Sequence, residues 1–301
     1  MKQQKISLRS LEEQRQYIYG LLEKKQYTLA EKAILEMPEQ KMDIQKEKLG
    51  LLTSLYIEMA EPIKAANEVQ KLLANFPQDG YGLFLLARIH FMAGKRLQVI
   101  DELEHALKKG QNINNSCREK IYNLLGQCWR YLGDSERSTK AYLQASRTAE
   151  DSDLQIMEYS NYLFNLHYLS QLSCREYIQA HKHYQKFFHQ VPRYWHRRRE
   201  EKKKLRIGYI SPDFRNHVVL RFSYALLAAY NHNDFEVWCY AKGEEDAYTH
   251  KAFSQVDGWR NISGLSAAAA ARCIYEDQID ILFDLAGHTK HNCLPIMAYK
   301  P

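Results

Sequence analysis

The 301 residues are 45% hydrophobic and 26% charged, which excludes a wholly disordered chain and is typical of a globular protein with room for two domains. The formal net charge is only +6, and much of it is local to residues 193–206. Lys2, Lys5 and Arg9 are followed by no apolar run, so we expect no signal peptide, and no stretch approaches the roughly 20 apolar residues of a membrane span.

The first 150 residues carry a repeated pattern of small and large side chains. The clearest copy begins at Thr53, a second begins 34 residues later at Ala87, a third begins at Gly126 and a weaker one begins at Ile18. The anchors of the four copies are Ile18, Leu21, Ala30, Ile34, Met37; Thr53, Tyr56, Ala65, Val69, Leu72; Ala87, His90, Val99, Leu103, Ala106; Gly126, Trp129, Ser138, Tyr142, Ala145. A period of 34 residues resembles the tetratricopeptide repeat, which predicts an α-helical solenoid over residues 1–150.

Such a solenoid exposes a concave groove that commonly binds a peptide or a partner protein. The chain has 21 tyrosines, and those in the repeats are candidates either for the core or for the lining of the groove. The pattern favours the core, because an aromatic stripe at helical spacing is usually buried.

Residues 151–204 are expected to form a helical bridge and a basic linker. An amphipathic helix is predicted over residues 175–188, and its His181 and His183 are two positions apart, so they face different sides and predict no metal site. The basic run at residues 193–206 is typical of a solvated linker. The alternative is a grip on phosphates, as in nucleic-acid binding, which we consider unlikely.

Residues 205–301 alternate between strand and helix patterns, which predicts an α/β Rossmann-like domain with a parallel sheet. We expect strands at residues 205–211, 235–241, 259–262 and 279–285, and helices at residues 220–230 and 267–275, the second capped by Ser266. No G-x-G-x-x-G motif is present, so dinucleotide binding has little support.

Two histidines follow predicted strands of this domain. His217 follows the first strand and a turn that contains Asp213 and Asn216, and His288 follows the last strand. Carboxyl ends of parallel strands share one edge of a sheet, so we expect His217 and His288 to converge on one crevice as an acid/base or ligand-binding pair. In the same turn as His288, Gly287 is expected to allow a close backbone approach.

The cysteines favour a reducing compartment. No C-x-x-C pair occurs among them, and several lie in apolar surroundings: Cys117, Cys128, Cys174, Cys239, Cys273, Cys293. We therefore expect reduced and largely buried side chains and a cytoplasmic protein.

Four motifs in this order, behind the repeats, resemble the O-GlcNAc transferase family, which includes plant-type O-fucosyltransferases and many bacterial homologues. The motifs are LRIGYISPDFRNH, NDFEVWCYA, WRNISGLS and IDILFDLAGHTKHN. The segment SNYLFNLHYLSQLSCREYIQAHKHY is similar to the family's bridge between the repeats and the catalytic region.

This resemblance implies the first half of a GT-B glycosyltransferase. The family moves a sugar from a nucleotide donor, usually UDP-GlcNAc, to Ser or Thr hydroxyls of proteins, and it requires neither a metal nor another cofactor. The histidine of its D-F-x-x-H motif falls on His217, which implies a catalytic role there. The resemblance implies substrate-binding roles for Asp213, Asn216, Gly287, His288 and Thr289.

The family pattern continues beyond Pro301 into a second half that holds most contacts to the nucleotide. We therefore expect a chain truncated after the first part of the catalytic region, with no turnover on its own. The alternative from another class is a non-enzymatic module in which the repeats bind a partner protein and the α/β part has no catalytic role.

Overall fold

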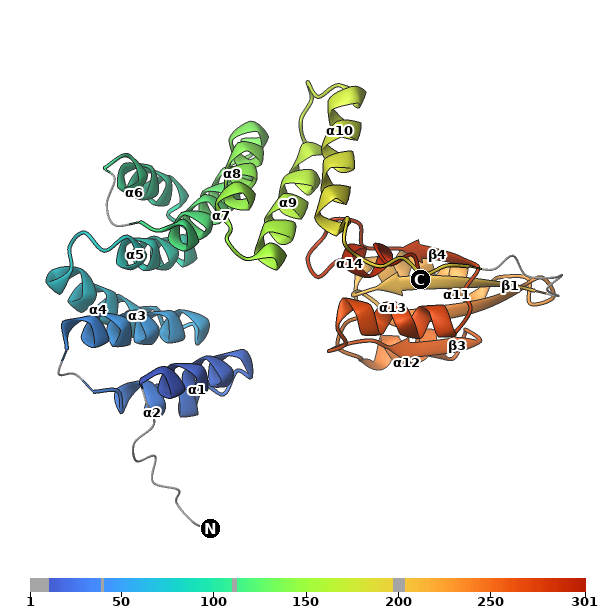
Figure 1. Ribbon diagram of the computed structural model, residues 1–301, viewed down its shortest axis with the longest axis horizontal. Coiled ribbons are helices and arrows are strands. Elements are labelled where there is room, and N and C mark those ends of the chain that lie inside the picture. The colour runs from blue at the N-terminus through green and yellow to red at the C-terminus, as the bar shows by residue number, and fades with distance from the viewer. Residues whose placement is uncertain (1–10, 39–40, 110–112, 197–203) are drawn as a thin grey trace, which may run out of the picture. The chain divides into compact units, whose positions relative to one another are not determined.

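The computed structural model describes residues 11–38, 41–109, 113–196 and 204–301 (Figure 1). The chain divides into two compact units, Met1–Tyr162 and Leu163–Pro301. The predicted three-part division at residues 150 and 204 stays a prediction. Most of the basic run between the predicted bridge and the first strand lies at residues 197–203, outside the described residues.

The first unit is an array of helices joined by short turns. Its helices are α1 Leu11–Glu23, α2 Tyr27–Leu35, α3 Met42–Glu58, α4 Pro62–Asn75, α5 Gly80–Met92, α6 Arg96–Lys108, α7 Asn115–Tyr131 and α8 Ser135–Thr148. Helix α9, Ser152–Leu166, runs across the boundary between the units. The array confirms the predicted helical solenoid.

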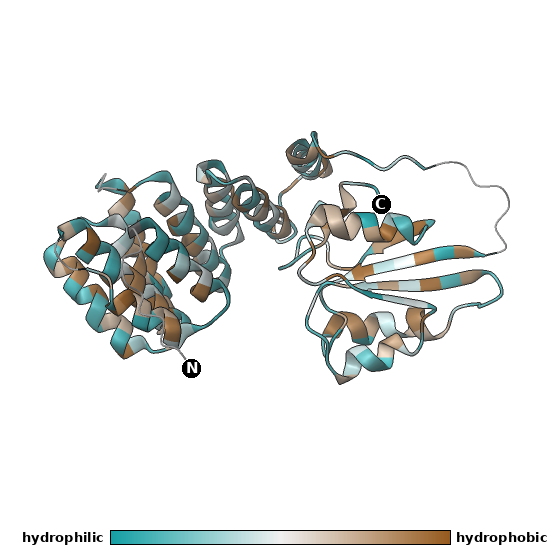
Figure 2. Cartoon of the chain, turned by 60° about the horizontal axis from the view of Figure 1, so that its bottom comes forward, coloured by the Kyte–Doolittle hydropathy of each residue, from teal (hydrophilic) through white to brown (hydrophobic). Residues whose placement is uncertain are grey.

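The repeated anchors form the core of this array. Eighteen of the twenty anchors are buried, and His90 and Trp129 are partly exposed. Figure 2 shows hydrophobic and hydrophilic residues separated on the faces of these helices, as packing in two layers requires. The tyrosines divide between the two predicted roles, because Tyr56 and Tyr142 are buried whereas Tyr19 and Tyr81 are exposed.

The second unit begins with the end of α9 and with α10, Cys174–Tyr184, which continues as a short 3-10 helix, Gln185–Phe188. Helix α10 starts where the sequence dictates. The Ser173 hydroxyl accepts from the N–H of Glu176, and the Glu176 carboxylate accepts from the N–H of Ser173, which is a complete capping box.

Within the described residues, four parallel strands form one sheet in the order β3-β2-β1-β4. They are β1 Leu205–Ser211, β2 Phe235–Ala241, β3 Gly258–Asn261 and β4 Ile281–Asp284. The first two match the predicted bounds, and the last two lie within three residues of them. This order is that of one half of a doubly wound sheet, in which ligands bind at the carboxyl edge of the strands.

Helices cover both faces of the sheet. The crossovers between successive strands contain α11 Val218–Ala228, α12 Ala247–Phe253 and α13 Ala267–Glu276, and α14 Leu294–Met297 follows β4. Ile274 of α13 and Ile296 of α14 pack with the buried Tyr240, whereas Leu227 of α11 packs with Cys239 in the other cluster. Ser266 caps α13 as predicted.

Helix α12 was not predicted, because only seven residues carry its pattern. Among the helices in the described ranges, none combines the length and the apolar character that a bilayer span requires.

Candidate functional site

A cavity of about 750 Å³ lies at the carboxyl edge of the sheet. Its walls come from the segments after all four strands: Asp213 and His217 after β1, Lys242 after β2, Ser263 after β3, and Thr289 and His291 after β4. This is the edge where the sequence predicted a site.

Close approach of two strand ends shapes the floor of the cavity. A Cβ placed on Gly243 would lie 2.3 Å from the carbonyl oxygen of Pro212, so only glycine lets the ends of β1 and β2 approach this closely. The Ser263 hydroxyl donates to the Gly243 carbonyl at 2.8 Å and links the end of β3 to the same point.

His217 lines this cavity as the N-cap of α11. Its Nδ1 accepts from the N–H of Val219 at 3.3 Å, so in this arrangement the neutral ring carries its proton on Nε2. The Asp213 carboxylate lies 3.7 Å from the same Nδ1, and the His217 side chain is 38% exposed. His217 is therefore held by the protein on one side of its ring and open to the cavity on the other.

Asp213 and Asn216 have different positions. Asp213 lines the cavity, and its side chain is 14% exposed. The Asn216 side chain accepts from Arg221 at 3.0 Å and does not line the cavity. The geometry thus makes Asn216 part of the turn that carries His217.

The turn after β4 brings Thr289 to the cavity but takes His288 away from it. Thr289 lines the cavity, and its hydroxyl donates to the carbonyl of Ala286 at 2.9 Å. The His288 ring packs instead on α10, 5.0 Å from the Tyr184 ring and 5.3 Å from the His181 ring. Burial, with smaller contributions from His181 and His167, lowers the pKa of His288 to about 4.

The expected convergence of His217 and His288 is therefore not what the structure shows. The physical reason is that the His288 ring packs against rings of α10, in a turn where Gly287 takes a left-handed φ of +54°. A Cβ at Gly287 would meet no atom of the protein within 4 Å, so within the chain only the positive φ favours glycine at this position.

His291 was not predicted as a site residue. It lines the cavity although its backbone takes a left-handed φ of +63°, which is unfavourable for a residue with a Cβ. The sequence places His288 and His291 in the pattern H-x-x-H, which does not indicate that only the second histidine lines the cavity.

The charge around His291 is mainly positive. Burial, and after it Lys290, Lys242 and Arg215, lowers the pKa of His291. The Lys242 ammonium also donates to the Asn292 carbonyl at 2.9 Å and so ties the end of β2 to the loop after β4. Clustered basic groups of this kind suit an anionic ligand.

Carboxylates of Asp213, Glu244 and Glu245 line the same cavity. Across the described ranges, no group of three or more His, Cys, Asp or Glu side chains could hold a metal ion. The cavity thus offers a histidine, a hydroxyl and charges of both signs, which suit orientation of polar substrates and proton transfer.

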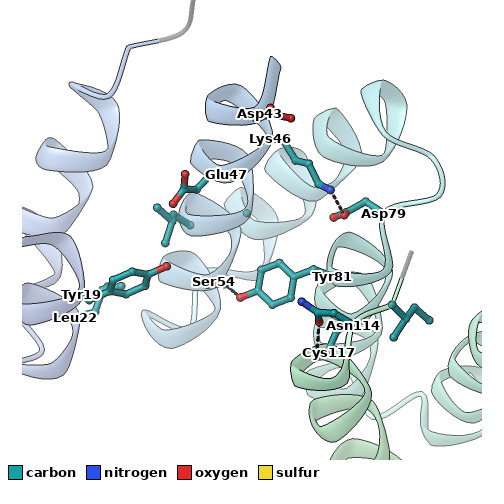
Figure 3. Close-up of a pocket in the computed structure, with 13 residues that line it drawn as sticks. Tyr19, Leu22, Asp43, Lys46, Glu47, Ser54, Asp79, Tyr81, Asn114 and Cys117 are labelled. Atoms are coloured by element: carbon teal, nitrogen blue, oxygen red, sulfur yellow. Dashed lines mark hydrogen bonds and ion pairs between the residues drawn. The ribbon is translucent and has the colours of Figure 1, made fainter. Parts of the chain in front are cut away.

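The first unit has a groove of its own, with a volume of about 780 Å³ (Figure 3). Helices α1, α3, α5 and α7 supply its walls, together with the residues that precede α5 and α7. Tyr19 and Tyr81 extend into it from α1 and α5, and the Tyr81 hydroxyl lies 2.9 Å from the Ser54 hydroxyl. Lys46 forms an ion pair with Asp79 at 2.5 Å. A groove lined by aromatic and polar groups is suited to a peptide.

Comparisons with known proteins identify relatives of this chain. Residues 172–301 match the model of the family described as glycosyl transferase family 41. The probable UDP-N-acetylglucosamine–peptide N-acetylglucosaminyltransferase SPINDLY of Petunia hybrida is 30% identical over 149 residues, covering 47% of this chain and 16% of that protein. A second relative, SEC of Arabidopsis thaliana, is described as a probable enzyme of the same type. It is 35% identical over 101 residues, covering 33% of this chain and 10% of that protein.

The chain therefore spans 16% or less of the length of these two curated relatives. A solved structure of a mutant O-GlcNAc transferase from Thermobaculum terrenum resembles the chain with a TM-score of 0.61. The two sequences are 21% identical, and the match covers 88% of this chain and 50% of that one. This likeness shows a shared fold of helical repeats followed by an α/β half.

Proposed function

The chain belongs, through residues 172–301, to glycosyl transferase family 41, the O-GlcNAc transferase family, and on this premise we propose that it forms the acceptor side of a sugar-transfer cleft. The reaction is transfer of GlcNAc from UDP-GlcNAc to a Ser or Thr hydroxyl of a protein. The α/β region is the Rossmann-like first half of the GT-B pair.

The observation that carries this proposal is the position of the cavity. All of its lining residues, from Pro212 to His291, lie inside the segment that matches the family. The cavity also occupies the carboxyl edge of the sheet, where doubly wound folds bind their ligands. Among the residues that the structure describes, no feature favours the non-enzymatic alternative over this function.

In the transfer, the acceptor oxygen bonds to the anomeric carbon, and the bond from that carbon to the diphosphate breaks. UDP leaves with the electron pair, and the hydroxyl loses its proton. With Val219 donating to Nδ1, the Nε2–H of His217 is a hydrogen-bond donor that orients a substrate oxygen. To act as base, the ring needs the other tautomer, in which the Nδ1 proton faces Asp213.

We further propose that Asp213, Thr289 and His291 contact the substrates and that the basic groups near His291 face the anionic donor. His288, Gly287 and Asn216 support the turns that carry these residues. The protein acceptor is held by the groove lined by Tyr19 and Tyr81. A cytoplasmic location fits this chemistry, because all six cysteines are free thiols in the structure.

The test uses the protein expressed from its complete reading frame. Transfer of radiolabelled sugar to protein acceptors is measured with UDP-GlcNAc and with GDP-fucose. His217→Ala is expected to lower kcat by about 100-fold or more, because it removes a group that orients and moves a proton in the transition state.

The control is His250→Ala, since His250 is an exposed residue of α12 that does not line the cavity. Its kcat is expected to equal that of the unaltered protein. Transfer only from GDP-fucose would overturn the proposed donor. Unchanged transfer in His217→Ala would overturn the proposed site.

A further inference from the structure

We propose that Asp246 and Thr249 of α12 are positioning residues that hold His217 in the cavity. This inference rests on the proposed function of His217. It adds a role for two side chains that do not themselves line the cavity.

The two residues first form the capping box that starts α12. The Asp246 Oδ1 accepts from the N–H groups of Tyr248 and Thr249 at 2.9 and 3.0 Å. The Thr249 hydroxyl accepts in return from the N–H of Asp246 at 2.9 Å. These bonds satisfy the free N–H groups of the helix end and would suffice for a purely structural cap.

Both side chains also reach beyond their own helix. The second carboxylate oxygen of Asp246, Oδ2, accepts from the N–H of Asn216 at 2.7 Å. The Thr249 hydroxyl donates to the carbonyl of Phe214 at 2.6 Å. Thr249 is 1% exposed and Phe214 is 2% exposed, so this contact is buried and excludes competing water.

These bonds fix the backbone immediately before His217. The carbonyl of Phe214 and the N–H of Asn216 flank Arg215, whose carbonyl in turn accepts from the N–H of His217 at 2.5 Å. Each peptide group from Phe214 to His217 is therefore tied either to α12 or to the turn itself. With this backbone fixed, the hydrogen bond from the Val219 N–H to Nδ1 orients the His217 ring.

The charge of Asp246 supports the same arrangement. The N–H of Asn216, and after it the N–H groups of Thr249 and Tyr248, lower the pKa of Asp246. The carboxylate therefore stays ionised and keeps both oxygens as acceptors. Charge-assisted hydrogen bonds of this type are stronger than neutral ones, so they can hold the turn that carries a catalytic side chain in one conformation.

Asp246→Asn separates the two roles of the carboxylate. The amide oxygen can still cap α12, but the amide NH₂ group then faces the N–H of Asn216, and two donors cannot bond. We expect the imidazole ¹⁵N resonances of His217 in the 301-residue chain to shift and broaden. In the protein from its complete reading frame, we expect kcat to fall about tenfold while KM for UDP-GlcNAc stays within about twofold.

Three comparisons distinguish positioning from simple loss of a cap. Ser266→Ala removes the cap of α13, whose buried residues belong to a different cluster from Phe214, and is expected to leave the His217 resonances and kcat unchanged. Thr249→Ser keeps the hydroxyl and is expected to restore what Thr249→Val loses. In a His217→Ala background, Asp246→Asn is expected to cost no further activity.

Unchanged His217 resonances in Asp246→Asn would overturn the inference, as would an equal change in Ser266→Ala. If the unaltered protein shows no sugar transfer, the proposed function fails. The resonances still decide whether Asp246 and Thr249 position His217, so the two failures are distinguishable.

Discussion

Replacing Glu158 by Gln is expected to remove a pH dependence from the stability of the helical array. Glu158 on α9 is fully buried, and burial raises its pKa from 4.5 to about 7. Hydrogen bonds from Asn161, and from Asn123 at 2.6 Å, oppose this rise, whereas the nearby carboxyl of Glu119 adds to it. Burial also raises the pKa of Glu119, so the two carboxyls titrate as a coupled pair.

The direction of the effect follows from proton binding. Between pH 4.5 and about 7, folded Glu158 keeps a proton that the unfolded chain has lost. Stability therefore falls as pH rises through this window and levels off above the folded pKa. At about 1.4 kcal/mol per pKa unit, the shift of Glu158 alone corresponds to a loss of about 3 kcal/mol.

The assay is thermal and urea unfolding of the full chain, followed by circular dichroism, at about pH 5 and about pH 8. Glu158→Gln is expected to match the unaltered chain near pH 5 and to exceed it by up to about 3 kcal/mol near pH 8. Glu150→Gln, a change at an exposed carboxyl, is the control and is expected to change neither value. Equal pH dependence in the unaltered chain and in Glu158→Gln would refute the reasoning.

Two further predictions concern the array. Ala60 takes a left-handed φ of +56° in the turn where the next repeat has Gly94 at +80°. Ala60→Gly is therefore expected to stabilise the chain by about 0.5–1 kcal/mol. The control Ala74→Gly, within α4, is expected to destabilise it by about 1 kcal/mol. Thermal unfolding of the two variants checks this, and a lower midpoint for Ala60→Gly would contradict it. Tyr81→Ala in the groove is expected to raise KM for protein acceptors about tenfold and leave kcat unchanged. Steady-state transfer kinetics give the KM, and the control is Tyr131→Ala, because Tyr131 is exposed but lies outside the groove. Equal KM values for the two variants would contradict a role of the groove.

Local patterns in the sequence determined which elements form. The repeated anchors from Thr53 to Ala145 predicted the helical array, because each helix must bury one face at a fixed spacing. Apolar residues likewise located β1 and β2 to the residue, since strands buried in a parallel sheet form short continuous apolar runs. The N-cap at Ser266 was visible for the same reason, because capping depends on residues within one turn of helix.

The tertiary structure decided which side chains share the cavity. The sequence placed His288 beside His217, but the His288 ring packs against α10, in a turn where Gly287 takes a left-handed φ, and His291 lines the cavity instead. Nothing in the local pattern distinguishes these two histidines, because the direction of a side chain in a loop depends on backbone angles that distant contacts fix.

Helix α12 is the clearest case of this division. Its capping box, Asp246 and Thr249, is a local signal, but the bonds from these residues to Asn216 and Phe214 join positions 30 and 35 residues apart. The sequence by itself therefore indicated most of the helices, the strands and the edge of the sheet at which the cavity lies. Only the folded chain decided how the turn before His217 is held, because these hydrogen bonds join segments that tertiary packing brings together.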